Sequence, residues 1–177
     1  MCSSDLALPN FQVAYAILHE AGKGPRPPKS LFVTGGAGGV GSAILQLARQ
    51  AGLAAITSIS SDEKAAFAQT QGAQHTINYR TENVAERVLA LTNGKGVDLV
   101  LDHVAGPDFT ANLSMLRPWG TLVSFNSYAG SPTKDLFSEL RGMVDLCVGI
   151  RVFSMHVFDH DAAARRAIMN KIGRAHV

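Results

Sequence analysis

The sequence predicts an α/β fold built on a doubly wound parallel sheet. Short apolar runs typical of buried strands alternate with stretches whose apolar residues recur at helical spacing. A glycine-rich segment, VTGGAGGVGSA at 33–43, lies between the first apolar run and the helix that follows it. Strands and helices that alternate at this spacing form a parallel sheet covered on both faces. The carboxyl ends of its strands then share one edge, where such folds bind ligands.

The predicted elements follow one another along the chain. Apolar runs predict strands at 30–35, 53–60, 73–79, 97–102, 120–125 and 149–155. Helical periodicity predicts helices at 11–21, 40–51, 61–71, 82–91, 109–116 and 161–171. Ser60 and Glu63 have the spacing of a capping box for the third helix, and Thr81 is the predicted cap of the fourth. The strand VDLVLD is almost continuously apolar, which favours a position buried on both faces.

The composition excludes several classes of protein. Of the 177 residues 46% are hydrophobic and 17% charged, which is ordinary for one globular domain. The net charge of +2 is too small and too dispersed to indicate binding to nucleic acid or to a membrane. No apolar run approaches the length of a membrane span. Two cysteines are too few for a disulfide framework or a zinc cage, so we expect a protein of the reducing cytoplasm.

The glycines exclude a P-loop. Gly36 and Gly41 have the required spacing, but Ser42 stands where the P-loop needs a lysine. Without that lysine the terminal phosphates of a nucleoside triphosphate lose their charge partner. An NTPase is therefore rejected.

The pattern of short-chain reductases is also incomplete. Thr34 and the glycines after it fit their glycine pattern, but their chemistry needs a tyrosine followed four residues later by a lysine. The three tyrosines are followed at that distance by His19, Asn83 and Pro132. The proton donor of that family is absent.

The remaining pattern is Gly36-x-Gly38-x-x-Gly41, the fingerprint of the Rossmann dinucleotide-binding fold. In this interpretation Gly36 permits a tight turn, Gly38 lets the backbone approach a pyrophosphate, and Gly41 lets the helix pack on the strand. The start of the helix supplies free N–H groups for the phosphates. A tight turn without a ligand is the alternative.

The end of the second strand favours NADPH over NADH. Folds specific for NAD carry an acid there, about 20 residues after the glycines, to hold the ribose 2′-hydroxyl. Here the strand ends in Ile and Ser, and the acids fall inside the next helix. The hydroxyls of Ser60 and Ser61, with Lys64, are predicted to bind a 2′-phosphate instead. The alternative makes Ser60 a helix cap and Lys64 a solvated side chain.

The motifs GGAGGVGSAILQLARQAG, GAQHTINYR, GKGVDLVLDHVAG and LRPWGTLVSFNS occur in order between about residue 7 and residue 171. In this the sequence resembles the zinc-independent quinone oxidoreductase branch of the medium-chain dehydrogenase/reductase superfamily. The resemblance implies that the backbone at Gly38, Gly39 and Val40 holds the pyrophosphate. It also implies roles for Ser60, Lys64 and Tyr79 around the 2′-phosphate, and for Val104, Phe125, Asn126 and Ser127 beside the nicotinamide. Simple packing is the alternative for Tyr79 and Phe125.

The resemblance also implies a domain organisation. Residues 1–29 would be a leader whose helix enters from a missing substrate domain, 30–155 the NADP-binding domain, and 156–177 a truncated return segment. The first five residues can be encoded by GTG TGC TCT TCC GAT, with GTG as the start codon, and the reverse complement of these codons encodes Ile-Gly-Arg-Ala-His, the sequence at 172–176. This also matches read-through of a common sequencing adapter. We therefore expect 1–6 and 172–177 to be artefacts and the chain to be a gene fragment. Chance complementarity is the alternative.

The function implied by the resemblance is transfer of a hydride from NADPH to a quinone or an activated alkene such as an enone. Two alternatives stay open: a zinc-type alcohol dehydrogenase whose ligands lie upstream, and a stand-alone NADPH-binding module without catalysis. The resemblance also suggests a homodimer paired at the sheet edge near the sixth strand.

Three other features carry no predicted role in catalysis. Asp102 and His103 end a strand at the functional edge, but a turn-capping Asp and a surface His are equally good interpretations. The histidines and aspartates at 156–161 are expected to form a solvated turn rather than a metal site. Trp119, which follows Pro118, is expected to be a turn and packing residue.

Overall fold

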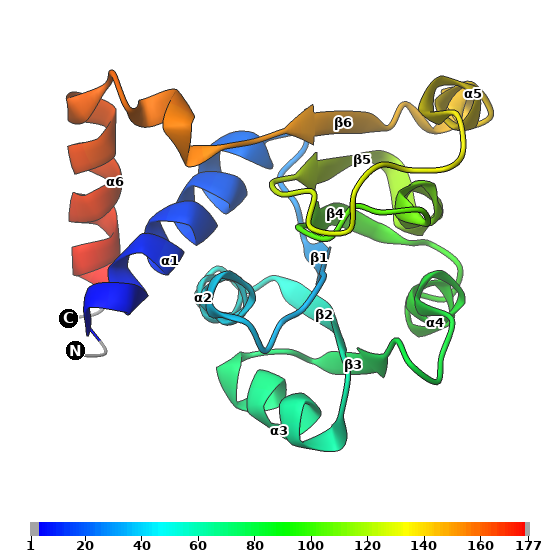
Figure 1. Cartoon of the computed structure of the whole chain (residues 1–177), viewed down its shortest axis with the longest axis horizontal. Helices are drawn as coiled ribbons and strands as arrows, with labels where there is room; N and C mark the ends of the chain where they lie inside the picture. Colours follow the sequence, from blue (N-terminus) through cyan, green and yellow to red (C-terminus); the bar gives the residue numbers. More distant parts are fainter. Residues whose placement is uncertain (1–3, 176–177) are drawn as a thin grey trace.

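The computed structural model describes residues 4–175 and contains one six-stranded sheet (Figure 1). The strands are β1 Ser30–Val33, β2 Ala54–Ile59, β3 His75–Asn78, β4 Val97–Asp102, β5 Leu116–Ser124 and β6 Gly149–Val152. They are all parallel and run in the order β3-β2-β1-β4-β5-β6. This order confirms the predicted doubly wound α/β fold.

The helices cover both faces of the sheet. They are α1 Ser4–Ala16, α2 Gly39–Gln50, α3 Asp62–Gln71, α4 Val84–Leu91, α5 Leu136–Arg141 and α6 Ala162–Ala175. A π-helical turn, η1 Ile17–Ala21, continues α1, and three 3₁₀ turns are η2 Phe109–Met115, η3 Val144–Leu146 and η4 Met155–Phe158. The sheet therefore separates two hydrophobic cores. In β1, Leu31 and Val33 face the core with α1 and α2, whereas Phe32 faces the other.

Several local details differ from the sequence prediction. Strand β6 ends at Val152 rather than at 155, because Met155 begins the turn η4, and the predicted first helix starts earlier, at Ser4. Ser61 caps α3, because its backbone is extended and its hydroxyl accepts a hydrogen bond from the Lys64 N–H, so Ser60 is not the cap. Asn83, not Thr81, caps α4 in the same way. Leu116 begins β5 rather than ending a helix, because it pairs with Val97 of β4. The short helix α5, capped by Asp135, has no apolar stripe long enough to predict it.

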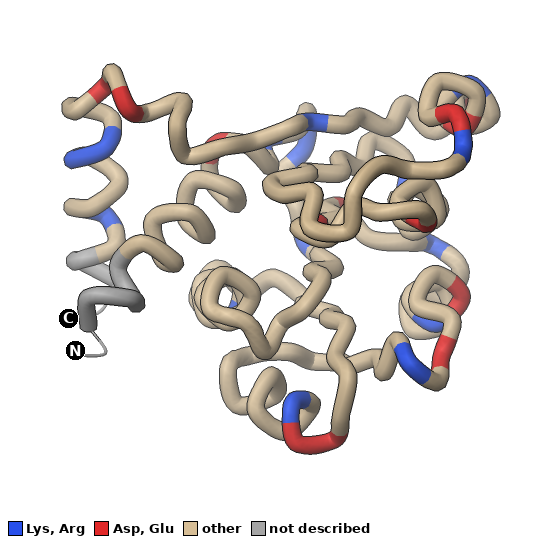
Figure 2. Tube along the Cα trace, in the orientation of Figure 1, with Lys and Arg blue, Asp and Glu red and all other residues tan. Residues whose placement is uncertain are grey.

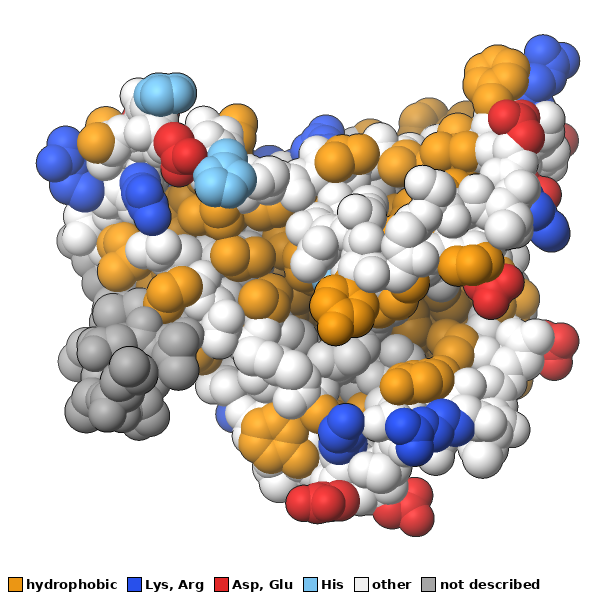
Figure 3. All heavy atoms as spheres, in the orientation of Figure 1, with side chains coloured by type: hydrophobic (Ala, Val, Ile, Leu, Met, Phe, Trp, Pro, Cys, Tyr) orange, Lys and Arg blue, Asp and Glu red, His pale blue; other side chains and the backbone are white. Residues whose placement is uncertain are grey.

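The first and last helices of the described part of the chain lie side by side. Helix α6 packs against α1, and Ile172 is buried in the core that α1 helps to form (Figure 1). Of the predicted artefacts, residues 1–3 and 176–177 lie outside the described part of the chain, and the prediction stays a prediction. Figure 3 shows hydrophobic side chains exposed between α6 and the middle of the molecule. No helix among the described residues is long and apolar enough to cross a membrane.

Candidate functional site

The glycine-rich turn joins β1 to α2 at the carboxyl edge of the sheet. Gly35 has φ +63°, the left-handed conformation that favours glycine, so the tight turn depends on Gly35 rather than on Gly36 as predicted. Gly36 is required for another reason. Its N–H donates to Thr57 Oγ1 over 2.9 Å, and a Cβ at Gly36 would lie 2.3 Å from that oxygen. The turn is thereby held against β2.

Helix α2 starts in very close contact with this turn. A Cβ at Gly41 would lie 2.4 Å from the Gly35 carbonyl oxygen and 2.8 Å from the Gly36 Cα. At Gly38, which precedes the helix, a Cβ would meet only the Gly35 oxygen, at 3.3 Å. The helix therefore abuts the turn at Gly41 and leaves the Gly38 side open.

The first turn of α2 presents unpaired donors to this opening. The Gly38 N–H donates to Gly35 O, and the Ser42 N–H donates to Gly38 O. No side chain caps the helix, and the N–H groups of Gly39, Val40 and Gly41 have no acceptor among the described residues. Unpaired N–H groups and the positive end of the helix dipole attract an anion such as a phosphate.

A second polar group lies at the ends of β2 and β3. Lys64 Nζ donates to Ser60 Oγ over 3.0 Å, and the Lys64 side chain is exposed. The Tyr79 N–H donates to Ile59 O over 3.1 Å, which places Tyr79 beside the end of β2, where its side chain is 54% exposed. The Ser61 hydroxyl is already used as the helix cap. A hydroxyl, an ammonium and a phenol ring thus surround this corner.

The switch point of the sheet lies between β1 and β4, and His103 fills it. Its Nδ1 lies 2.8 Å from Thr34 Oγ1, and its Cε1 would be 2.7 Å from a Cβ at Gly35. The ring centroid lies 5.8 Å from that of Phe125. His103 is half-buried, so it is not the surface residue that the sequence suggested. Sequence reasoning missed its contact with Gly35 because the two residues are far apart in the chain.

Asp102, at the carboxyl end of β4 beside His103, holds the turn that follows the strand. It is fully buried, and its carboxylate accepts hydrogen bonds from the N–H groups of Val104 and Ala105. Asp102 is therefore a turn-capping residue, as one of the two sequence interpretations had it. Its carbonyl oxygen accepts from the Phe125 N–H, which holds the segment after β5 beside the end of β4.

The residues predicted to border the nicotinamide follow these two strands. Val104 is half-buried, and its carbonyl accepts from the Ala129 N–H over 2.8 Å. Asn126 and Ser127 are exposed, and the Asn126 Oδ1 accepts from the Ser127 N–H. All the predicted site residues therefore lie along one edge, from β3 to β5.

A parallel sheet in this order, with a glycine-rich turn and a bare helix N-terminus at its switch point, defines a dinucleotide-binding domain. The chain belongs to the zinc-binding dehydrogenase family, whose model matches residues 39–169. Within it, the relatives support the quinone oxidoreductase branch of the medium-chain dehydrogenase/reductase superfamily.

Three relatives show the extent of the similarity. The chain is 36% identical to the 2-haloacrylate reductase of a Burkholderia species over 117 residues, which are 66% of this chain and 35% of that protein. The quinone oxidoreductase of Pseudomonas syringae superposes with a TM-score of 0.85 at 29% identity, over 95% of this chain and 51% of that one. Escherichia coli quinone oxidoreductase complexed with NADPH superposes with a TM-score of 0.75 at 26% identity, over 94% of this chain and 49% of that one. The chain thus spans between a third and a half of these relatives.

The family description mentions zinc, but the described residues do not fit it. Nowhere between 4 and 175 do three His, Cys, Asp or Glu side chains come close enough together to hold a metal ion. His156 pairs with Asp159 over 2.8 Å in an exposed turn.

Proposed function

We propose that these residues form the NADPH-binding domain of an oxidoreductase that transfers a hydride to a quinone or an activated alkene. The Lys64–Ser60 pair carries the choice of cofactor, because it stands at the end of β2 where an NAD-specific fold places a carboxylate. The solved E. coli relative bound to NADPH supports it. The relatives named for quinones and for 2-haloacrylate, an activated alkene, support the class of acceptor.

Each part of the cofactor has residues suited to it. The unpaired N–H groups at the start of α2 would hold the pyrophosphate, and the open side of Gly38 leaves room for it. Ser60, Lys64 and Tyr79 would surround the 2′-phosphate, and Ser61 would contribute through the cap that orients Lys64. The nicotinamide would lie near the ends of β4 and β5, bordered by Val104, Phe125, Asn126 and Ser127.

The cofactor, when bound, supplies the hydride chemistry, and this chain supplies position. The contact of His103 with Thr34 and its packing against Phe125 would hold the His103 ring in place beside the nicotinamide. A quinone needs no placed acid, because its reduced oxygens take protons from water. An enone would need one, and we find no convincing donor among the described residues of this edge. We therefore expect cofactor binding with poor turnover.

Titration of the chain with NADPH and NADH tests the cofactor. Binding is followed by the fluorescence of the reduced nicotinamide, and NADPH should bind about tenfold or more tightly, as expected for a charge-assisted contact to phosphate. The Lys64→Ala variant should lose this preference, whereas Lys95→Ala, in the exposed turn before β4, should keep it. Tighter binding of NADH, or an unchanged preference in Lys64→Ala, would overturn the proposal.

The alternatives give different results in turnover assays. A stand-alone binding module binds NADPH without oxidising it in the presence of a benzoquinone, even after a substrate domain from a relative is joined to α1. A zinc-type dehydrogenase would oxidise alcohols only once zinc ligands are supplied by that domain. Hydride transfer to the quinone without added zinc supports the function proposed here.

We also propose a homodimer and a location in the cytoplasm. Strand β6 is the last strand of the sheet, and Val152 on it is 82% exposed, which suits the homodimer suggested by the resemblance. Location in the cytoplasm rests on the composition alone.

A further inference from the structure

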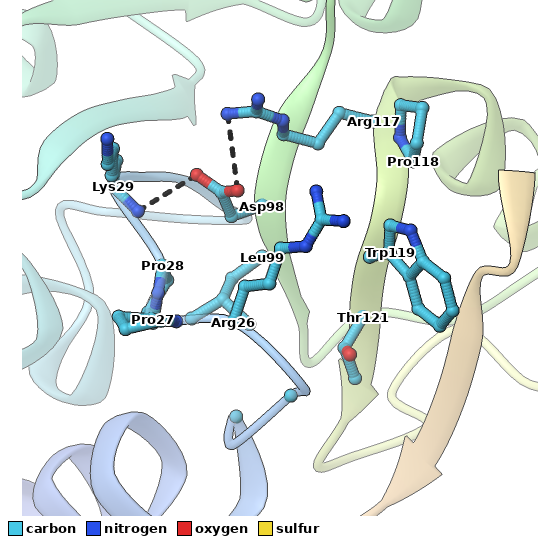
Figure 4. A pocket seen from close by; sticks show the side chains of 12 residues that line it. Arg26, Pro27, Pro28, Lys29, Asp98, Leu99, Arg117, Pro118, Trp119 and Thr121 are labelled. Atoms are coloured by element: carbon cyan, nitrogen blue, oxygen red, sulfur yellow. Dashed lines mark hydrogen bonds and ion pairs between the residues drawn. The ribbon is translucent and has the colours of Figure 1, made fainter.

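A cavity lies at the edge of the sheet opposite the glycine-rich turn. Its volume is about 390 Å³, and it is lined by the segment that leads into β1 and by the starts of β4 and β5 (Figure 4). That volume lies in the range of small-molecule sites. The cavity is at the amino ends of the strands, so the proposed NADPH site does not use it.

One wall of the cavity is a bulge in β5. Val97 pairs with Leu116 and Leu99 pairs with Thr121, so β5 has extra residues opposite Asp98. Pro118 lies in this bulge, where its missing N–H costs no ladder hydrogen bond. Trp119 follows with φ +69°, a conformation that bulky residues rarely adopt. Bulges re-aim side chains, and this one turns the indole toward the cavity (Figure 4).

The lining carries more positive than negative charge. Its charged side chains are Arg26, Lys29, Arg117 and Asp98. The Asp98 carboxylate is already used: it pairs with Arg117 over 3.3 Å and accepts from the N–H groups of Lys29 and Ser30. Among the described residues Arg26 has no carboxylate partner, and its guanidinium lies 5.6 Å from the centroid of the Trp119 ring.

We propose that this cavity binds a small aromatic anion, with its ring beside Trp119 and its carboxylate or phosphate held by Arg26 and Arg117. A guanidinium binds either oxyanion through paired hydrogen bonds and stacks on flat rings. The indole supplies a flat apolar surface, and the prolines at 27 and 28 line the side away from Trp119 (Figure 4). The site is independent of the cofactor proposal, because it lies at the other edge of the sheet.

Trp119 is the only tryptophan of the chain, so its fluorescence reports on this cavity alone. The protein is titrated with benzoate and with phenyl phosphate, which differ in the oxyanion. Benzamide keeps the ring without the charge, and cyclohexanecarboxylate keeps the charge without the aromatic ring. At least one of the aromatic anions should change the fluorescence saturably and bind about tenfold more tightly than either control compound. The stronger of the two identifies the oxyanion.

Variants then assign the binding to Arg26. Arg26→Gln should weaken binding about tenfold, and Arg26→Lys should weaken it less, because the charge remains. Arg141→Gln, on α5 outside the cavity, is the matched control and should bind as the parent does. NADPH affinity should be unchanged in all three. The proposal is overturned if neither anion saturates, if benzamide or cyclohexanecarboxylate binds equally well, or if Arg26→Gln has no effect.

Discussion

The two edges of the sheet form sites in opposite ways. At the carboxyl edge the glycine-rich turn and the start of α2 expose backbone N–H groups, and the described residues there carry few charged side chains. At the amino edge the cavity is made of side chains, with arginines and an indole around one satisfied carboxylate (Figure 4). One edge therefore depends on the absence of side chains, whereas the other depends on their identity.

Strand β4 connects the two edges. Asp102 at its carboxyl end accepts from the N–H groups of Val104 and Ala105, which shapes the turn after the strand. Asp98 near its amino end accepts from the N–H groups of Lys29 and Ser30, which ties down the loop before β1. Figure 2 shows that charged residues are otherwise scattered along the chain. Both carboxylates therefore accept hydrogen bonds from backbone N–H groups, and Asp98 also forms an ion pair with Arg117.

The largest effect is expected from Gly41→Ala at the carboxyl edge. The added Cβ would lie 2.4 Å from the Gly35 oxygen, a backbone atom that cannot move without opening the turn. Unfolding in urea should show a loss of about 3 kcal/mol, and NADPH binding should be lost. Gly149→Ala, where the nearest atom is 3.9 Å away, is the control. Retained NADPH affinity in Gly41→Ala would disprove a site built from backbone.

A smaller effect is expected from Asp98→Asn at the amino edge. The change removes the charge that pairs with Arg117 and weakens the hydrogen bonds from Lys29 and Ser30. Because the side chain of Asp98 is largely buried, the free energy of unfolding should fall by about 1–3 kcal/mol. Asp145→Asn, exposed on η3, should change it little. NADPH affinity should persist; its loss would mean that the two edges are coupled.

The smallest effect is a pH dependence near the amino edge. Burial lowers the pKa of His19 below its ordinary value of 6.5; Lys171 and Lys23 act in the same direction, and Glu20 opposes them. The folded state therefore binds fewer protons than the unfolded state. Stability should fall as the pH drops below 6.5 and through the folded pKa. His19→Gln should flatten this part of a melting-temperature profile, whereas His75→Gln, exposed on β3, should not. Equal slopes in all three proteins would contradict it.

Much of the fold could be predicted from local patterns. Strand β4 has the predicted bounds, because an almost continuous apolar run indicates a strand buried on both faces without any knowledge of its tertiary contacts. The start of α2 is predicted from the glycine pattern and the helical spacing after it, and the structure explains two of these glycines locally: a Cβ at Gly41 would clash with the turn and one at Gly36 with Thr57 of the next strand. Predictions failed where two local candidates competed: Ser60 and Ser61 are both good caps, and only the backbone angles at Ser61 decide.

The features of the candidate sites likewise fall into those set by neighbours in the chain and those set by long-range contacts. The alternation of strands and helices, the glycine-rich turn and the lack of an acid at the end of β2 can all be recognised in the sequence, because they depend on neighbours in the chain. Three features become visible only in the folded chain: His103 packs on Gly35, Leu116 starts a strand, and Arg26 lies over the ring of Trp119. These contacts join residues far apart in sequence, and their geometry follows from strand order and register, which no local periodicity encodes.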